Sequence, residues 1–166
     1  MSRFITPLPQ GLHFADPVVA IATFGGSGLL RPAPGTWGTA AAVFAAWPLG
    51  VIGGPVVLSI AAVIAFLGGL WATEKYIAAS GNQDPSEVVI DEVAAMWLVM
   101  AAIPPTPVSY LLGFAFFRLF DIWKPFPIRQ LEKRVGGEMG VMVDDMVAAI
   151  YAIIATWVVG IAYFTV

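Results

Sequence analysis

The chain has 166 residues, the length of a single domain, and apolar residues make up 59 % of it. Charged residues make up only 11 %, whereas soluble domains carry about 25 %, so the composition favours a membrane protein. The net charge of −3 and the lack of a long basic run argue against nucleic acid as a partner. With no Cys and a single His, the chain has no disulfide, thiolate metal site or catalytic histidine pair.

Membrane helices are predicted in three charge-free stretches, which are Pro32–Thr73, Val93–Phe117 and Met146–Val166. The first is too long for one span and is broken near Pro48–Pro55. It predicts a helical hairpin with a short arm of about Thr39–Trp47 and a longer arm of about Pro55–Ala72. The apolar segment Val18–Leu30 before it is expected to lie at the membrane interface or against the bundle.

The second charge-free stretch is interrupted by a proline cluster, and prolines cannot continue a helix. It predicts a second hairpin, with arms of about Glu87–Ile103 and Val108–Trp123. The last stretch has neither proline nor charge and predicts a further membrane helix that Asp144 and Asp145 open.

Topology follows from the basic residues. If both hairpins turn on the same side, every Lys and Arg falls on the other side, which the positive-inside rule assigns to the cytoplasm. The basic residues are Arg3, Arg31, Lys75, Arg118, Lys124, Arg129, Lys133 and Arg134. The prediction is therefore an all-α, polytopic membrane helix bundle with about four to five membrane-embedded helices.

Acidic residues gather at the helix ends on the same predicted face, and they are Glu87, Asp91, Glu92, Asp121, Asp144 and Asp145. On the expected third helix, Glu87 and Asp91 are i,i+4 neighbours whose charges repel unless a cation lies between them. Oxygen ligands without His or Cys suit a hard cation, magnesium before calcium. The sequence therefore predicts a magnesium site at helix ends near the cytoplasmic surface.

Basic and glycine-rich segments accompany the acidic residues. Arg118, Lys124 and Arg129 supply positive charge for a phosphomonoester. The segments Gly25–Gly28 and Pro34–Thr39 can bring backbone N–H groups close to phosphate, and the second also begins a helix, whose N-terminus favours anions.

Each of these features also has a purely structural interpretation. Asp144 and Asp145 can cap a helix, and Arg118 with Asp121 can be a structural ion pair. Glycines can serve close helix packing. A small cation-binding or transporting membrane protein is the alternative function, but charges at helix ends and basic residues within the cluster suit a phosphate better than a naked cation.

Several motifs together resemble the phosphatidylglycerophosphatase A family. They are Gly26–Leu29, Pro34–Thr39, Asp91-Glu92 with Met96-Trp97, the block Phe117–Arg129, and Gly136-Gly137 with Gly140–Asp145. They span most of the chain, and the block Phe117–Arg129 is the most specific. The N-terminal arm, residues 1–22, matches no motif of the family, although the whole chain is expected to be one domain of this type.

The resemblance implies magnesium-dependent hydrolysis of phosphatidylglycerophosphate, an anionic phospholipid, at the cytoplasmic face of the bacterial inner membrane. The metal ligands would be Asp91, Glu92, Asp121, Asp144 and Asp145. The phosphate would be bound by Ser27, Thr36, Thr39, Arg118, Lys124 and Arg129. Catalytic roles fall to Glu87, Asp91, Asp121 and Lys124, with Glu87 or Asp91 as general base. Attack by water and an aspartyl-phosphate intermediate both stay open.

Overall fold

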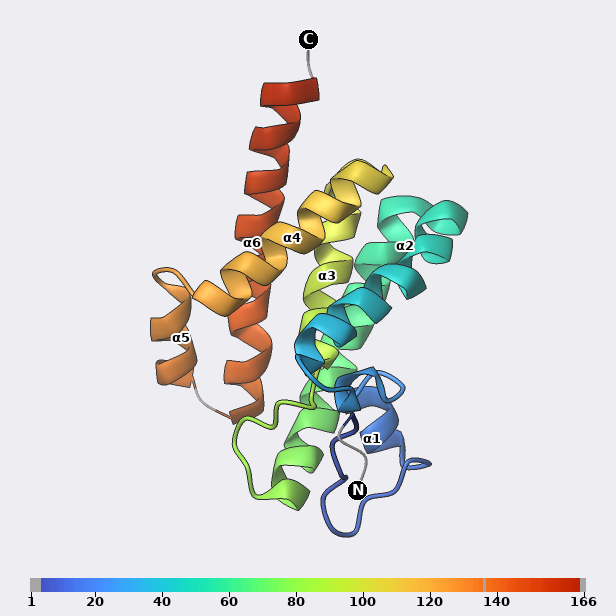
Figure 1. The fold of residues 1–166 in the computed structure, drawn as a ribbon, viewed down its shortest axis with the longest axis vertical. Coiled ribbons are helices and arrows are strands. Elements are labelled where there is room, and N and C mark those ends of the chain that lie inside the picture. The colour runs from blue at the N-terminus through green and yellow to red at the C-terminus, as the bar shows by residue number, and fades with distance from the viewer. Residues whose placement is uncertain (1–3, 136, 165–166) are drawn as a thin grey trace.

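The computed structural model describes residues 4–135 and 137–164, and the regular elements there are helices (Figure 1). In chain order they are α1 (Pro17–Ala22), the 3₁₀ helix η1 (Ser27–Leu29), α2 (Pro34–Ser80), α3 (Ile90–Ala102), α4 (Pro107–Trp123), α5 (Ile128–Val135) and α6 (Gly137–Phe164). Within the described ranges, extended pairing is limited to an isolated bridge between Ile5 and Leu30. The all-α prediction is therefore confirmed.

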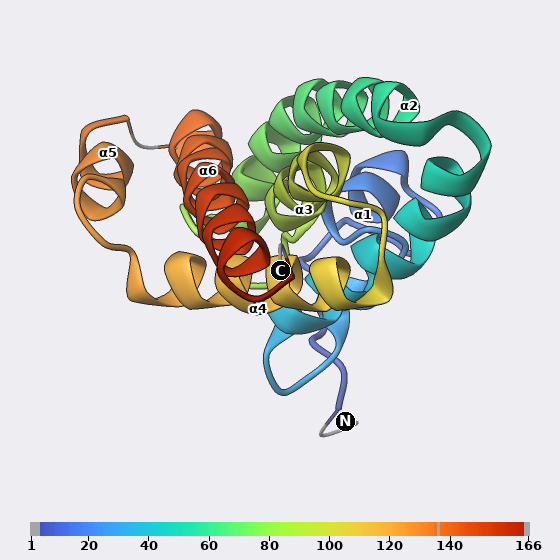
Figure 2. The same ribbon diagram turned by 90° about the horizontal axis from the view of Figure 1, so that it is seen from above.

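Helix α2 contains the first predicted hairpin, with its turn at Gly54. This glycine has φ 61° and ψ −156°, which L-residues rarely adopt, and Pro55 follows it directly. The chain reverses direction there (Figures 1 and 2). Pro48 instead lies inside the first arm, because its fixed φ fits a helix and neighbouring groups can satisfy the freed carbonyl. The first arm is thus longer than the predicted Thr39–Trp47.

Helices α3 and α4 form the second hairpin, and α4 begins at Pro107 with Thr106 as its N-cap. The expected start of α3 at Glu87 is wrong, because α3 begins at Ile90. The Val89 N–H donates a hydrogen bond to the Ala22 carbonyl at 2.8 Å, which ties the segment before α3 to α1. Glu87 therefore lies in the loop before the helix.

The last helix also differs from its prediction. Helix α6 begins at Gly137, so Asp144 and Asp145 lie about two turns inside it and neither opens nor caps it. The short helix α5 was not expected from the sequence, and Ile128 at its start is fully buried.

The charged and uncharged connections lie at opposite ends of the molecule. Figure 1 shows the turn of α2 and the α3–α4 connection at the upper end, and the α2–α3 loop and the start of α6 at the lower end. Both hairpins therefore turn at the same end of the molecule, which is the condition on which the predicted topology rests.

Exposed apolar surface covers the two longest helices. The segments Pro34–Ser80 and Gly137–Ala162 are long and apolar enough to cross a membrane. Large apolar side chains such as Phe44, Ile52 and Ile161 are exposed on them, which is costly in water and favourable in lipid. Helix α3, in contrast, is central and packs its side chains against α2, α4 and α6 (Figure 2). The fold therefore indicates a membrane protein.

Candidate active site

A polar cavity of about 520 Å³ opens where the first turn of α2, the start of α3, the end of α4 and the first half of α6 converge. The α2–α3 loop, residues 81–89, forms a further wall. The charged residues that line the cavity are Asp84, Asp91, Glu92, Arg118, Asp121, Lys124, Asp144 and Asp145. The predicted convergence of acidic and basic groups is therefore present for these residues, although Asp144 and Asp145 reach the cavity from inside α6 and not from its end.

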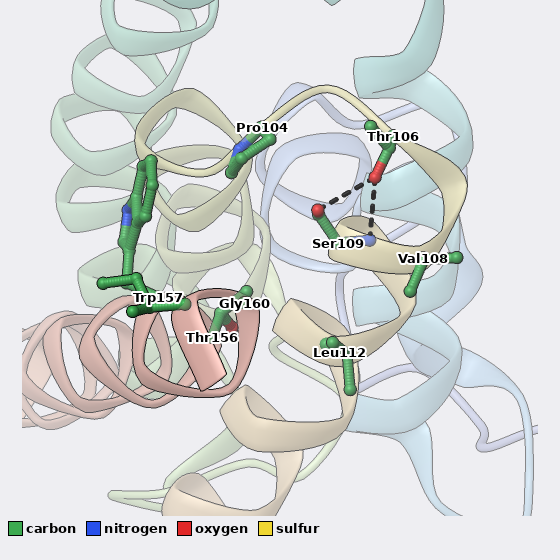
Figure 3. A pocket seen from close by; sticks show the side chains of 9 residues that line it. Pro104, Thr106, Val108, Ser109, Leu112, Thr156, Trp157 and Gly160 are labelled. Atoms are coloured by element: carbon green, nitrogen blue, oxygen red, sulfur yellow. Dashed lines mark hydrogen bonds between the residues drawn. The ribbon is translucent and has the colours of Figure 1, made fainter. Parts of the chain in front are cut away.

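A second cavity, of about 350 Å³, lies at the opposite end of the bundle between the start of α4 and the end of α6 (Figure 3). Its lining residues, among them Val108, Leu112 and Trp157, carry no charge. Thr106 accepts a hydrogen bond from the Ser109 N–H at its rim, which caps α4. Of these two cavities, the polar one alone has groups for acid–base or metal chemistry among its described lining residues.

Three carboxylates form the centre of the polar cavity. Oxygens of Asp91, Glu92 and Asp145 all lie within 4.8 Å of one another. Asp91 and Asp145 are buried, and Glu92 is only 13 % exposed. Asp91 Oδ1 and Glu92 Oε2 are buried with no hydrogen-bond partner among the described residues. Because unpaired buried carboxylates are costly, this oxygen-only cluster fits a hard cation such as magnesium.

The other two predicted metal ligands, Asp121 and Asp144, each contact a basic side chain through one oxygen. Asp121 Oδ2 lies 2.5 Å from Arg118 Nη1, and Asp144 Oδ2 lies 2.6 Å from Lys124 Nζ. Arg118 Nη1 also contacts Glu92 Oε1 at 3.5 Å, which connects this pair to the three carboxylates. Asp121 and Asp144 are therefore placed to hold these two basic side chains beside the carboxylate cluster.

The end of α4 sets the positions of the two basic side chains, Arg118 and Lys124. Arg118 and Asp121 lie one turn apart on the last two turns of the helix, so their side chains share a face. Lys124 ends the helix with φ 45° and ψ 63°, a left-handed conformation that costs a non-glycine residue roughly 1 kcal/mol or more. Its N–H bonds to the Phe120 carbonyl at 2.8 Å, and its side chain reaches Asp144 on α6.

The first turn of α2 forms the opposite side of the cavity. Ala33, Pro34 and Gly35 line it, so the N-terminus of α2 opens toward the charged groups. A side chain at Gly35 would collide with Glu92 Oε1 and approach the guanidinium of Arg118. The prediction that the Pro34–Thr39 run begins a helix is confirmed, and the positive end of the helix dipole supports anion binding here.

Four of the predicted phosphate-binding residues do not line this cavity. Ser27 Oγ donates to the carbonyls of Thr23 and Phe24, and Thr39 Oγ1 donates to the Gly35 carbonyl at 2.7 Å. Thr36 lies on α2 outside the lining, and Arg129 is exposed on α5. Ser and Thr hydroxyls satisfy nearby carbonyls in this way, and their role in phosphate binding stays a prediction.

Glu87 also lies outside the cavity lining. Its Oε1 accepts a hydrogen bond from the fully buried Tyr76 at 3.2 Å. The expected i,i+4 relation between Glu87 and Asp91 is wrong, because the helix begins only at Ile90. Asp91 is therefore the better placed of the two residues proposed as general base.

Sequence reasoning missed part of the site. Gln83, Asp84 and Ser86 of the α2–α3 loop line the cavity, although no motif singled them out. Gly35 lay inside a recognised motif, but its close packing against Glu92 is visible only in the structure. Polar residues between two predicted membrane helices on the charged side were the available signal.

The fold and the cavity together describe an all-helical protein with two helices apolar enough to cross a membrane, and with clustered carboxylates and two basic side chains at one end. The sequence model of the phosphatidylglycerophosphatase A family matches residues 20–160. The chain is 39 % identical to the phosphatidylglycerophosphatase A of Haemophilus influenzae, over 89 % of this chain and 91 % of the relative. It is 32 % identical to that of Escherichia coli, over 92 % and 86 %. No solved structure matches the chain significantly.

The chain therefore belongs to the phosphatidylglycerophosphatase A family, as its motifs indicated. Family membership favours a phosphatase over the cation transporter that the sequence left as an alternative.

Proposed function

We propose a magnesium-dependent mechanism for the activity that family membership gives this chain, the hydrolysis of phosphatidylglycerophosphate to phosphatidylglycerol and phosphate in phospholipid synthesis. The observation that carries the mechanism is the cluster of Asp91, Glu92 and Asp145, with two buried oxygens that lack a partner in the described chain. Arg118 and Lys124 line the same cavity.

Magnesium would be held by the three clustered carboxylates. When bound, the ion supplies positive charge at the phosphoryl oxygens and makes a nearby water more acidic. Asp121 and Asp144 were predicted as two further ligands. They form ion pairs with Arg118 and Lys124, and their role would be to orient these two side chains.

Arg118 and Lys124 bind the phosphate in this mechanism. Arg118 is fixed by Asp121 and Glu92, while its buried Nε has no hydrogen-bond partner within the described ranges. That donor is available to a phosphoryl oxygen. The positive charges of Arg118 and Lys124 stabilise the negative charge that develops on the phosphoryl oxygens in the transition state.

Proton transfer completes the reaction. Water attacks phosphorus as the bond from phosphorus to the glycerol oxygen breaks, and Asp91 accepts the proton of the water. The leaving oxygen takes up a proton and becomes the hydroxyl of phosphatidylglycerol.

We infer the position of the protein in the membrane from the end of the bundle that carries the charged residues. The two arms of α2 together with α3, α4 and α6 would cross the bilayer, and α3, whose 13 residues span only about 20 Å, would do so inside the bundle and away from lipid. The positive-inside rule supports a position of the cavity at the cytoplasmic surface of the bacterial inner membrane, where the phosphomonoester of the lipid would enter.

Phosphate release from detergent-solubilised phosphatidylglycerophosphate tests this mechanism. Activity should vanish with EDTA and return with Mg²⁺, and Asp145→Asn should keep its loss of about 1,000-fold in kcat even when Mg²⁺ is added in excess. Asp16→Asn is the matched control, because Asp16 accepts a hydrogen bond from the His13 N–H and lies outside the cavity lining. Full wild-type activity after exhaustive chelation would contradict the metal mechanism.

A further inference from the structure

The α2–α3 loop faces the charged groups across the cavity with a different kind of chemistry. Its lining side chains include the neutral Gln83 and Ser86 beside a single carboxylate, that of Asp84, whereas the walls from α3, α4 and α6 carry the other carboxylates and the basic side chains. A phosphorylated glycerol head group has the same division, with a charged phosphate at one end and a neutral hydroxyl beside it. The two walls therefore match the two parts of such a ligand.

We propose that this loop reads the glycerol of the head group, with Gln83 and Ser86 as the residues that bind its hydroxyl. The inference rests on the proposed function and adds a specificity determinant to it. The Gln83 amide forms no hydrogen bond within the described residues, so its donor and acceptor are both available to a hydroxyl. Ser86 Oγ donates weakly to Glu87 at 3.4 Å, which leaves its lone pairs free to accept.

The end of the loop next to α3 is anchored by contacts with α1, α2 and the η1 segment. Val89 is tied to the Ala22 carbonyl, and Glu87 is tied to Tyr76. Gly28 packs against the Glu87 carbonyl and the Val89 side chain, so that no larger residue would fit there. Preorganised groups lose little freedom on binding, and this makes their hydrogen bonds effective in specificity.

This anchoring also explains why glycine stands at positions 28 and 38, which do not line the polar cavity. A Cβ at Gly38 would lie 2.5–3.1 Å from the side-chain atoms of Val89, closer than real contacts allow. Gly28 and Gly38 therefore let the first turns of α2 and the η1 segment press against the base of the loop. Within the loop, the Asp84 N–H donates to Asn82 Oδ1 at 3.2 Å, and Asn82 Nδ2 donates back to the Asp84 carbonyl at 3.1 Å.

The test compares two lipids that share the phosphomonoester and the acyl chains. Phosphatidylglycerophosphate carries the glycerol head group, and phosphatidic acid lacks it. The double variant Gln83→Ala/Ser86→Ala should lower kcat/KM for phosphatidylglycerophosphate about 10-fold, because each lost hydrogen bond costs several-fold. The same variant should change phosphatidic acid, measured as substrate or as competing inhibitor, less than about 2-fold.

The matched control is the double variant Gln130→Ala/Ser59→Ala, since both residues are exposed and lie outside the cavity lining. It should leave the ratio of the two lipids unchanged. Equal losses for both lipids in Gln83→Ala/Ser86→Ala, or no loss for either, would overturn the inference while the proposed phosphatase function stands. A wild-type protein that releases phosphate from neither lipid would refute the proposed function, and this inference with it.

Discussion

Replacing Gly35 with alanine should inactivate the enzyme without unfolding it. A Cβ at this position would lie 2.9 and 3.1 Å from the terminal nitrogens of Arg118, and it would overlap Glu92 Oε1. Either the ion pair or the first turn of α2 must move by roughly 1 Å, and a misplacement of about 1 Å can cost about 100-fold in rate. We therefore expect kcat to fall about 100-fold.

Stability should respond differently from activity in this variant. Alanine is favoured over glycine in helices by up to about 1 kcal/mol, so the free energy of unfolding should stay within about 1 kcal/mol of wild type. Two further glycines of α2 serve as controls. Gly68 has open space around its Cβ position, whereas at Gly69 a Cβ would meet Met142 and Ile90. Gly68→Ala should change neither property for the worse, and Gly69→Ala should lose about 1–3 kcal/mol of stability through overpacking.

Phosphate release and thermal unfolding in the same detergent separate these outcomes. The three variants should differ in kind: Gly35→Ala in kcat, Gly69→Ala in stability and Gly68→Ala in neither. A Gly35→Ala protein with wild-type kcat would show that the Glu92–Arg118 arrangement is not needed for the reaction.

Three other predictions follow from the site and the topology. Asp145→Asn should lower kcat about 1,000-fold and Asp144→Asn about 10-fold, because only Asp145 belongs to the three-carboxylate cluster; equal losses in initial rate would contradict that division. Arg118→Lys should lower kcat about 100-fold although the charge is kept, since Lys cannot contact Glu92, Asp121 and a phosphate together; an effect on KM alone would mean that Arg118 only attracts lipid. In intact cells, Pro105→Cys should react with an impermeant thiol reagent and Glu138→Cys should not, and labelling of Glu138→Cys from outside would reverse the proposed topology.

Much of the fold could be predicted from hydropathy and proline positions. The charge-free stretches located both hairpins and the last helix, because lipid-exposed helices must be apolar along their length. The starts of α3 and α6 were misplaced for a physical reason. Hydropathy assigns charged residues to helix ends, but Asp144 and Asp145 lie inside α6, where the cavity rather than lipid surrounds them.

The site could be predicted only in part. The acidic and basic residue types predicted a metal and a phosphate, and most of these residues do line one cavity. Which carboxylates share the cluster and which pair with cations depends on how α3, α4 and α6 are rotated against one another. Sequence spacing fixes only neighbours on one helix, such as Arg118 and Asp121. The contact between Lys124 and Asp144 joins two helices, and so it was visible only in the structure.

Binding of a divalent cation to the carboxylate cluster is the central claim, and Mn²⁺ measures it directly. Mn²⁺ prefers the same oxygen ligands as Mg²⁺, and its free and bound forms differ in electron paramagnetic resonance. The purified protein should bind Mn²⁺ saturably. Asp91→Asn and Asp145→Asn should each weaken the affinity at least about 10-fold, whereas Asp16→Asn should leave it unchanged. Wild-type affinity in Asp91→Asn and Asp145→Asn would show that the cation does not bind at these carboxylates.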